Sequence, residues 1–158
     1  MFVSLNDLQQ LRTDHRKQRI GYVVGTFDLF HTGHLDYLEW AWDRCDLLFV
    51  CVRNDARVKQ VKGDDRPIIP EFDRARIVNS LKGTAFTHIA PDIPDTGKPS
   101  IKIAELLKPD IVIIGNDWGQ EAPGWKQALS NSHVTVCPMP YVNSTTKIIN
   151  RIRHYRES

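Results

Sequence analysis

The sequence predicts an α/β protein, a single doubly wound, Rossmann-like domain over residues 1–158 with a five-stranded parallel sheet and helices on both faces. Three observations support this fold class. Short β-rich runs alternate with helix-like segments along the chain. The first run is apolar throughout rather than alternating, which is typical of a strand buried on both faces. Polar clusters follow four of the runs, at the edge where such sheets bind ligands.

The expected strands are the β-rich runs, and the expected helices lie between them. The strands cover 20–26, 46–52, 85–90, 110–115 and 133–138. Helices are expected over 33–44, 71–83, 101–109, 123–130 and 144–155. Residues 1–19 should add an amphipathic helix packed on the domain, because Ser4 and Asp7 form a capping-box-like start. The polar, basic segment 53–70 is expected to be a surface loop.

Composition and charge narrow the classes of partner. The net charge of +2 is too small to favour a nucleic acid or a membrane surface. The three cysteines form no CxxC pair, and Cys51 and Cys137 lie in apolar runs, which favours a reducing compartment. The chain opens with no signal-peptide pattern and contains no apolar window of roughly 18 residues. We therefore expect a cytoplasmic protein with neither a nucleic-acid nor a membrane partner.

The stretch VVGTFDLFHTGH, residues 23–34, predicts a phosphate site. Gly25 ends the first strand, and Gly33 and His34 begin a helix whose free N–H groups and dipole attract anions. His31 and His34 can donate hydrogen bonds to phosphate oxygens, which stabilises charge that develops during nucleotidyl transfer. Such chemistry needs positioning more than a covalent nucleophile. The alternatives are a zinc site, which lacks nearby Cys or Glu ligands, and a turn with two solvated histidines.

Four motifs in order resemble the cytidylyltransferase-like nucleotidyltransferases. They are GTFDLFHTGH, with the His-x-Gly-His signature of that family, VKGDDRPIIPEFDRARIVNSL, LKPDIVIIGNDW and NSTTKIINRI. Together they span residues 20–153. The resemblance implies a doubly wound fold, ATP or CTP as co-substrate with Mg²⁺ bound mainly through the phosphates rather than by protein ligands, and a homodimer.

The resemblance also implies roles for individual residues. His31 and His34 would contact the triphosphate and stabilise the transition state. Lys62 and Arg74 would reach the phosphates and complete the catalytic set. Asp28 would hold the loop or face the acceptor. The expected nucleotide-binding residues are Gly25, Thr26, Phe27, Gly33, Lys59, Gly115, Asp117, Trp118, Ser144, Thr145 and Thr146.

Several of these residues also have a purely structural interpretation. The lysines would then be solvated loop charges, Trp118 a core aromatic, and the hydroxyls at 144–146 helix caps. Arg66 and Arg76 fit either a phosphate contact or surface cover. The arginines near the C-terminus favour a solvated helix face over a nucleic-acid site.

The expected acceptor is a phosphorylated sugar or polyol. The segments DLQQLR, VKGDDRPI and Asp95-Thr96 resemble the adenylyltransferase domain of bacterial heptose-phosphate enzymes, so a heptose-1-phosphate adenylyltransferase-like enzyme is the leading hypothesis. That branch usually has Cys at the position of Thr26. GTFD and GNDW are closer to glycerol-3-phosphate cytidylyltransferases, the second hypothesis, which usually carry an Arg before Ser-Thr-Thr. The third is a non-catalytic nucleotide-binding sensor, although both histidines and the basic segment are present.

Overall fold

Five parallel strands form the central sheet of the computed structural model, which describes residues 1–91, 99–115, 123–138 and 143–155. Their order across the sheet is β3-β2-β1-β4-β5. All four neighbouring pairs are parallel, as the register of each pair shows. The strands are β1 (Ile20–Gly25), β2 (Leu47–Val52), β3 (Thr84–Ile89), β4 (Ile111–Ile114) and β5 (His133–Val136). The expected α/β class and five-stranded parallel sheet are therefore confirmed.

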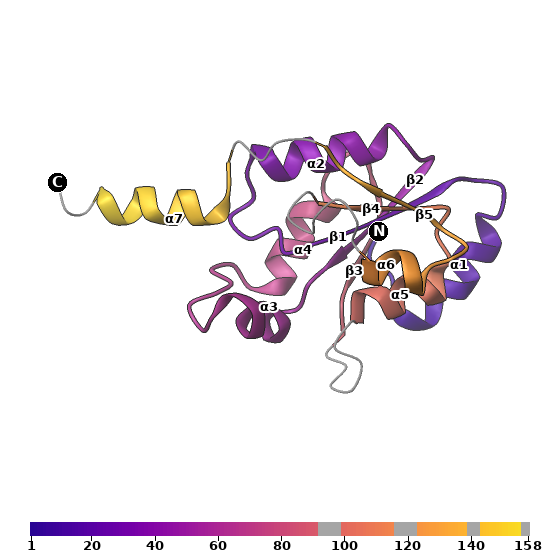
Figure 1. The fold of residues 1–158 in the computed structure, drawn as a ribbon, viewed down its shortest axis with the longest axis horizontal. Coiled ribbons are helices and arrows are strands. Elements are labelled where there is room, and N and C mark those ends of the chain that lie inside the picture. The colour runs from indigo at the N-terminus through magenta and orange to yellow at the C-terminus, as the bar shows by residue number, and fades with distance from the viewer. Residues whose placement is uncertain (92–98, 116–122, 139–142, 156–158) are drawn as a thin grey trace.

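Helices cover both faces of the sheet, and each face has its own apolar core (Figure 1). Successive residues of a strand point to opposite faces, so Tyr22 and Val24 belong to one core while Val23 belongs to the other. The first core is covered by α1 (Leu8–Asp14), α5 (Pro99–Leu107) and α6 (Pro123–Ala128). The second is covered by α2 (Thr32–Trp42) and α4 (Glu71–Asn79). Burial on both faces explains why β1 is apolar throughout.

The N-terminal segment packs on the sheet as expected, although its α-helix is shorter. A 3₁₀ turn (Leu5–Asp7) precedes α1, and the carboxylate of Asp7 accepts a hydrogen bond from the Ser4 backbone N–H at 2.9 Å. Leu8 and Leu11 are buried in the first core. Arg12 forms an ion pair with Asp110 at 2.9 Å, which ties α1 to the residue just before β4.

The expected surface loop at 53–70 contains a helix, α3 (Asp55–Lys62), so that part of the prediction is wrong. The side chain of Asn54 caps the helix by accepting a hydrogen bond from the Arg57 backbone N–H at 2.8 Å. Val58 anchors α3 in the interior, and Gly63, with φ of 94°, ends it in a conformation that favours glycine. A local cap and one buried side chain thus order a segment whose composition is mostly polar.

The last helix, α7 (Thr145–His154), begins at the sheet edge and projects away from the rest of the fold (Figure 1). Its outer end is exposed, with Tyr155 just beyond it 82% accessible. Only the first turn of α7 therefore takes part in the site described below. Of the helices that the structure describes, none combines the length and apolar character needed to cross a bilayer.

Candidate active site

A pocket of about 220 Å³ opens where β1 and β4 end and where α2 and α7 begin. In the sheet order β1 has β2 on one side and β4 on the other, so the chain reverses its winding direction here. Doubly wound sheets bind ligands at this switch point. The residues that line the pocket are Val24, Gly25, Thr26, Phe27, His31, His34, Tyr37, Arg53, Lys62, Arg66, Gly115, Asn143, Ser144, Thr145 and Thr146.

The turn between β1 and α2 has an unusual backbone. Phe27 and Leu29 have φ of 56° and 46°, a region that costs energy for residues other than glycine. The Phe27 ring packs directly on Gly25, where a Cβ atom would lie 2.6 Å from the ring. A side chain at position 25 would therefore displace Phe27, and glycine is required there. Strained turns of this kind are concentrated at functional sites.

Two stacked imidazoles form one side of the pocket. His31 immediately precedes α2, His34 lies in its first turn, and the ring centroids are 3.8 Å apart. His34 also contacts the rings of Phe27 and Phe30, at centroid distances of 5.4 and 5.5 Å. Among the described residues, neither ring's buried Nδ1 atom has a hydrogen-bond partner. Burial without partners is costly, so a ligand that accepts hydrogen bonds here would be favoured.

Burial also determines the charge of these imidazoles. The pKa of His34 is lowered to about 3, mainly by loss of solvation and also by the neighbouring His31 and Lys62, while Asp28 opposes the shift. Desolvation also lowers the pKa of His31. With its pKa at about 3, His34 is neutral near pH 7 and can donate through one ring nitrogen without carrying a charge.

The start of α7 closes the pocket beside the histidines. The Ser144 hydroxyl accepts from the Lys147 backbone N–H at 3.2 Å, so it caps the helix. The Thr145 hydroxyl donates to the Asp28 carbonyl oxygen at 2.8 Å. Gly33 allows close approach, since a Cβ atom there would lie 3.0 Å from the Asn143 carbonyl oxygen. The N-termini of α2 and α7, each the positive end of a helix dipole, therefore both adjoin the pocket.

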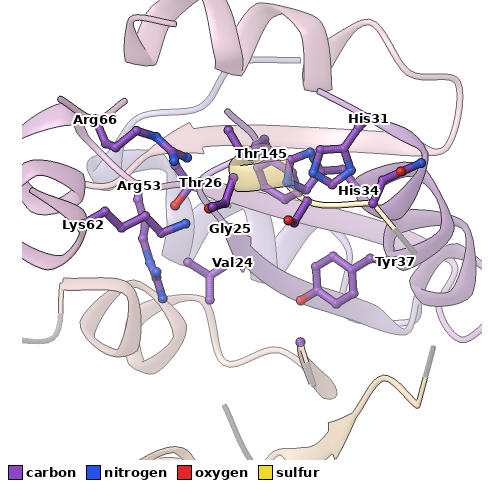
Figure 2. A pocket seen from close by; sticks show the side chains of 15 residues that line it. Val24, Gly25, Thr26, His31, His34, Tyr37, Arg53, Lys62, Arg66 and Thr145 are labelled. Atoms are coloured by element: carbon purple, nitrogen blue, oxygen red, sulfur yellow. The ribbon is translucent and has the colours of Figure 1, made fainter. Parts of the chain in front are cut away.

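Basic side chains form the opposite side of the pocket. Figure 2 shows Lys62 and Arg66 reaching toward the Gly25–Thr26 turn from the side opposite His31 and His34. Arg53, directly after β2, joins them in the lining. Among the lining residues that the structure describes, none is acidic. Imidazole donors, helix N-termini and basic side chains around one pocket favour an anionic ligand.

Asp28 holds the loop that carries Arg66. Its carboxylate accepts from the backbone N–H groups of Ile68 at 3.0 Å and Ile69 at 2.9 Å, and from Arg66 Nε at 3.1 Å. Only 1% of Asp28 is exposed. Asp28 thus holds the loop, and its carboxylate is buried and engaged with protein donors rather than open to an acceptor.

The structure also contradicts the expected phosphate contact of Arg74. This residue is fully buried and does not line the pocket. Its Nε donates to the Ile69 carbonyl oxygen at 2.8 Å, and its Nη1 donates to the Thr26 carbonyl oxygen. Its Nη2 donates to the Arg53 carbonyl oxygen at 2.8 Å and to Asp55 at 2.6 Å. Arg74 therefore joins the segments that follow β1 and β2 and holds them behind the pocket.

The structure brings together most of the residues expected at the site. Gly25, Thr26, Phe27, His31, His34, Lys62, Gly115, Ser144, Thr145 and Thr146 line the pocket. Gly33 lies behind the His31 ring, and Lys59 is exposed on α3 outside the lining. Asp117 and Trp118, and also Asp95 and Thr96, lie outside the described residues. The sequence analysis did not predict Tyr37, Arg53 and Asn143 as lining residues. The position of Arg53 directly after a strand could have identified it, because ligands bind where parallel strands end.

Comparison with known families agrees with this geometry. Residues 22–153 match the family described as Cytidylyltransferase-like. The chain belongs to this family. Membership indicates a nucleotidyltransferase, which agrees with a pocket whose lining favours an anionic ligand.

Curated relatives in this family include two proteins named Bifunctional protein HldE. The protein from a Nitratiruptor species is 41% identical over 139 residues, which are 87% of this chain and 28% of that protein. The protein from a strain of Helicobacter pylori is 34% identical over 146 residues, 92% of this chain and 30% of that protein. The chain thus spans less than a third of the length of these relatives.

Solved structures share the fold of this cytidylyltransferase-like chain. A lipopolysaccharide core biosynthesis protein from Thermoplasma volcanium aligns with a TM-score of 0.64 and 22% identity over 80% of this chain and 99% of that one. A pantoate-beta-alanine ligase from Francisella tularensis aligns with a TM-score of 0.67 and 16% identity. The alignment covers 99% of this chain and 78% of that one. Identities this low establish the fold alone.

Proposed function

We propose that this chain transfers AMP from ATP to a heptose phosphate and releases pyrophosphate. The observation that carries the proposal is the pair of stacked, half-buried imidazoles of His31 and His34 facing basic side chains across the switch point of the sheet. The matches to HldE proteins support the heptose-phosphate branch of the family. The resemblance of VKGDDRPI to the same branch agrees with these matches.

In this proposal the triphosphate lies between the two sides of the pocket. The backbone N–H groups at the start of α2 and the hydroxyls of Ser144 and Thr146 face its oxygens, as suits a helix N-terminus. Lys62 supplies a compact positive charge from the end of α3. The lining holds the nucleotide and orients its α-phosphorus toward the acceptor, which is the main contribution a protein makes to phosphoryl chemistry.

The reaction forms one bond and breaks one. A phosphate oxygen of the acceptor attacks the α-phosphorus, and the bond from this phosphorus to the bridging oxygen of the β-phosphate breaks as pyrophosphate leaves. Negative charge grows on the α-phosphate oxygens, and the imidazole N–H groups of His31 and His34 donate to it. Donors placed in advance in a partly desolvated site stabilise that charge without reorganisation.

Mg²⁺ would enter with the nucleotide. The described residues contain no group of three or more His, Cys, Asp or Glu side chains arranged to hold a metal. The carboxylate of Asp28, which lies close to the pocket, is engaged with the loop. As the family resemblance implies, the phosphates would mainly hold the ion, and when bound it would supply further neutralisation of their charge.

The test is pyrophosphate release by the purified chain with Mg²⁺, measured for ATP and CTP against heptose 1-phosphates and glycerol 3-phosphate. We expect the highest rate with ATP and a heptose 1-phosphate. Release with CTP and glycerol 3-phosphate alone would instead support the second branch, which GTFD and GNDW favour. Nucleotide binding without release for any pair would support the sensor.

We also propose a homodimer in the cytoplasm. The resemblance supports the dimer, and the free thiols of Cys45 and Cys51 are consistent with a reducing compartment. Light scattering coupled to gel filtration tests the assembly, because a mass near 18.2 kDa would contradict it.

A further inference from the structure

We infer that Arg66 binds a phosphate oxygen of the nucleotide, and that Asp28 is the positioning residue that aims it. The inference rests on the proposed function for the identity of the ligand. It assigns a role to a residue that the motifs left ambiguous between a phosphate contact and surface cover.

Arg66 is a buried cation that lines the pocket. Its side chain is 10% exposed, and its guanidinium points toward the Gly25–Thr26 turn (Figure 2). The Nε atom donates to Asp28, but the buried Nη2 atom has no hydrogen-bond partner among the described residues. A buried guanidinium nitrogen without an acceptor is costly, so this nitrogen is placed for a ligand.

The other buried arginine of the site provides the contrast. In Arg74, Nε, Nη1 and Nη2 all donate to protein oxygens, and the residue does not line the pocket. In Arg66, the contact with Asp28 fixes the orientation of the planar group and leaves Nη2 for the ligand. The first arginine is therefore structural, and the second is held in place for binding.

The chemistry of the missing acceptor is that of a phosphate. A guanidinium presents its N–H groups in a rigid plane that matches two oxygens of one phosphate. Arg53 and Lys62 in the same lining add positive charge, so an anion is favoured over a neutral acceptor. Asp28 also accepts from Ile68 and Ile69 N–H groups, so the ion pair and the loop are fixed together before the ligand arrives.

The experiment measures the affinity for sodium tripolyphosphate by calorimetry at constant ionic strength. We compare the wild type with Arg66→Gln, Arg66→Lys and the control Arg76→Gln, in which an exposed arginine of α4 is replaced. A hydrogen bond to a charged group contributes about 1.5–3 kcal/mol, so Arg66→Gln should weaken binding by roughly ten- to a hundredfold. Arg66→Lys should also weaken binding by about tenfold, because an ammonium group cannot donate hydrogen bonds to Asp28 and to a phosphate in one plane. Arg76→Gln should bind within about twofold of the wild type, because its side chain lies outside the pocket lining.

Unchanged affinity in Arg66→Gln, full affinity in Arg66→Lys, or a wild type that does not bind tripolyphosphate overturns the inference. If Arg66→Gln does not fold, as circular dichroism would show, the Lys variant decides. Pyrophosphate release is measured separately on the same samples. Arg66-dependent tripolyphosphate binding without any release would contradict the proposed reaction alone, whereas release with unaltered KM and kcat in Arg66→Gln would contradict the role of Arg66 alone.

Discussion

The two sides of the pocket hold their polar groups in different ways. The histidine side uses short, neutral rings fixed at the start of α2 and surrounded by aromatic contacts. The basic side uses long charged side chains from α3 and the loop after it, and this loop is held from behind by Asp28 and Arg74. Short, rigid hydrogen-bond donors suit the negative charge that develops on the phosphate only in the transition state. Cationic side chains held by a fixed loop suit the negative charge that the nucleotide already carries when it binds.

Loss of the histidine side should have the largest effect. We expect His34→Ala to lower kcat by on the order of 10²-fold or more with little change in KM, as loss of a donor used mainly in the transition state would. The control is His133→Ala, which replaces an exposed histidine of β5 outside the pocket. Steady-state kinetics check both variants. An equal fall in kcat for His34→Ala and His133→Ala would contradict the role of the histidine side in the transition state.

Loss of Arg74, which holds the basic side from behind, should appear first as a loss of stability. We expect Arg74→Met to lower the free energy of unfolding by about 3 kcal/mol, because it leaves buried carbonyl oxygens of Thr26, Arg53 and Ile69 without a donor. Urea denaturation followed by circular dichroism measures the change. Stability equal to the wild type combined with a raised KM would restore the direct phosphate contact that the structure contradicts.

The two lysines of α3 offer a matched pair on the basic side. Both lysines are exposed, but Lys62 lines the pocket whereas Lys59 lies outside the lining. We expect Lys62→Ala to raise the Kd for the nucleotide about tenfold, the effect of one partly desolvated charge contact. Lys59→Ala should change the Kd by less than about twofold. Fluorescence titration with a labelled nucleotide measures the Kd of both variants. Equal increases in Kd would show that the lysines act through a diffuse electrostatic field rather than that Lys62 makes a defined contact.

The smallest expected effect concerns protons on the histidine side. Because the pKa of His34 is lower in the folded chain than in the unfolded chain, the unfolded chain binds more protons as the pH falls below about 6.5. This residue therefore costs the wild type about 1 kcal/mol of stability between pH 7 and 5.5. Unfolding measured across that range should show a shallower loss in His34→Gln. Parallel curves of unfolding free energy against pH for the wild type and His34→Gln would mean that the His34 ring is better solvated than its surroundings suggest.

Much of this arrangement could be predicted from the sequence, because local patterns specify it. Apolar runs identified the five strands, and the spacing of His31 and His34 around Gly33 identified the start of α2. Ser144 capped α7 as its residue type predicts. What failed depends on contacts distant in sequence. Arg74 finds one acceptor 48 residues away, and no local pattern distinguishes that position from a phosphate ligand.

The helix α3 was missed for the opposite reason. A cap at Asn54 and one buried side chain, Val58, help to stabilise it within a segment whose average character is polar and charged. Composition averaged over the segment conceals such isolated anchors. Arg66 was ambiguous because its role depends on the carboxylate of Asp28, 38 residues earlier in the chain.

The hydrogen bond from Thr145 to the Asp28 carbonyl oxygen joins residues 117 positions apart. Residues 143–146 form part of the pocket lining, so the lining is incomplete until this segment has been synthesised. A chain growing on the ribosome would therefore complete the pocket lining only after residue 146 has been added. Premature termination before residue 143 would leave the pocket without this part of its lining.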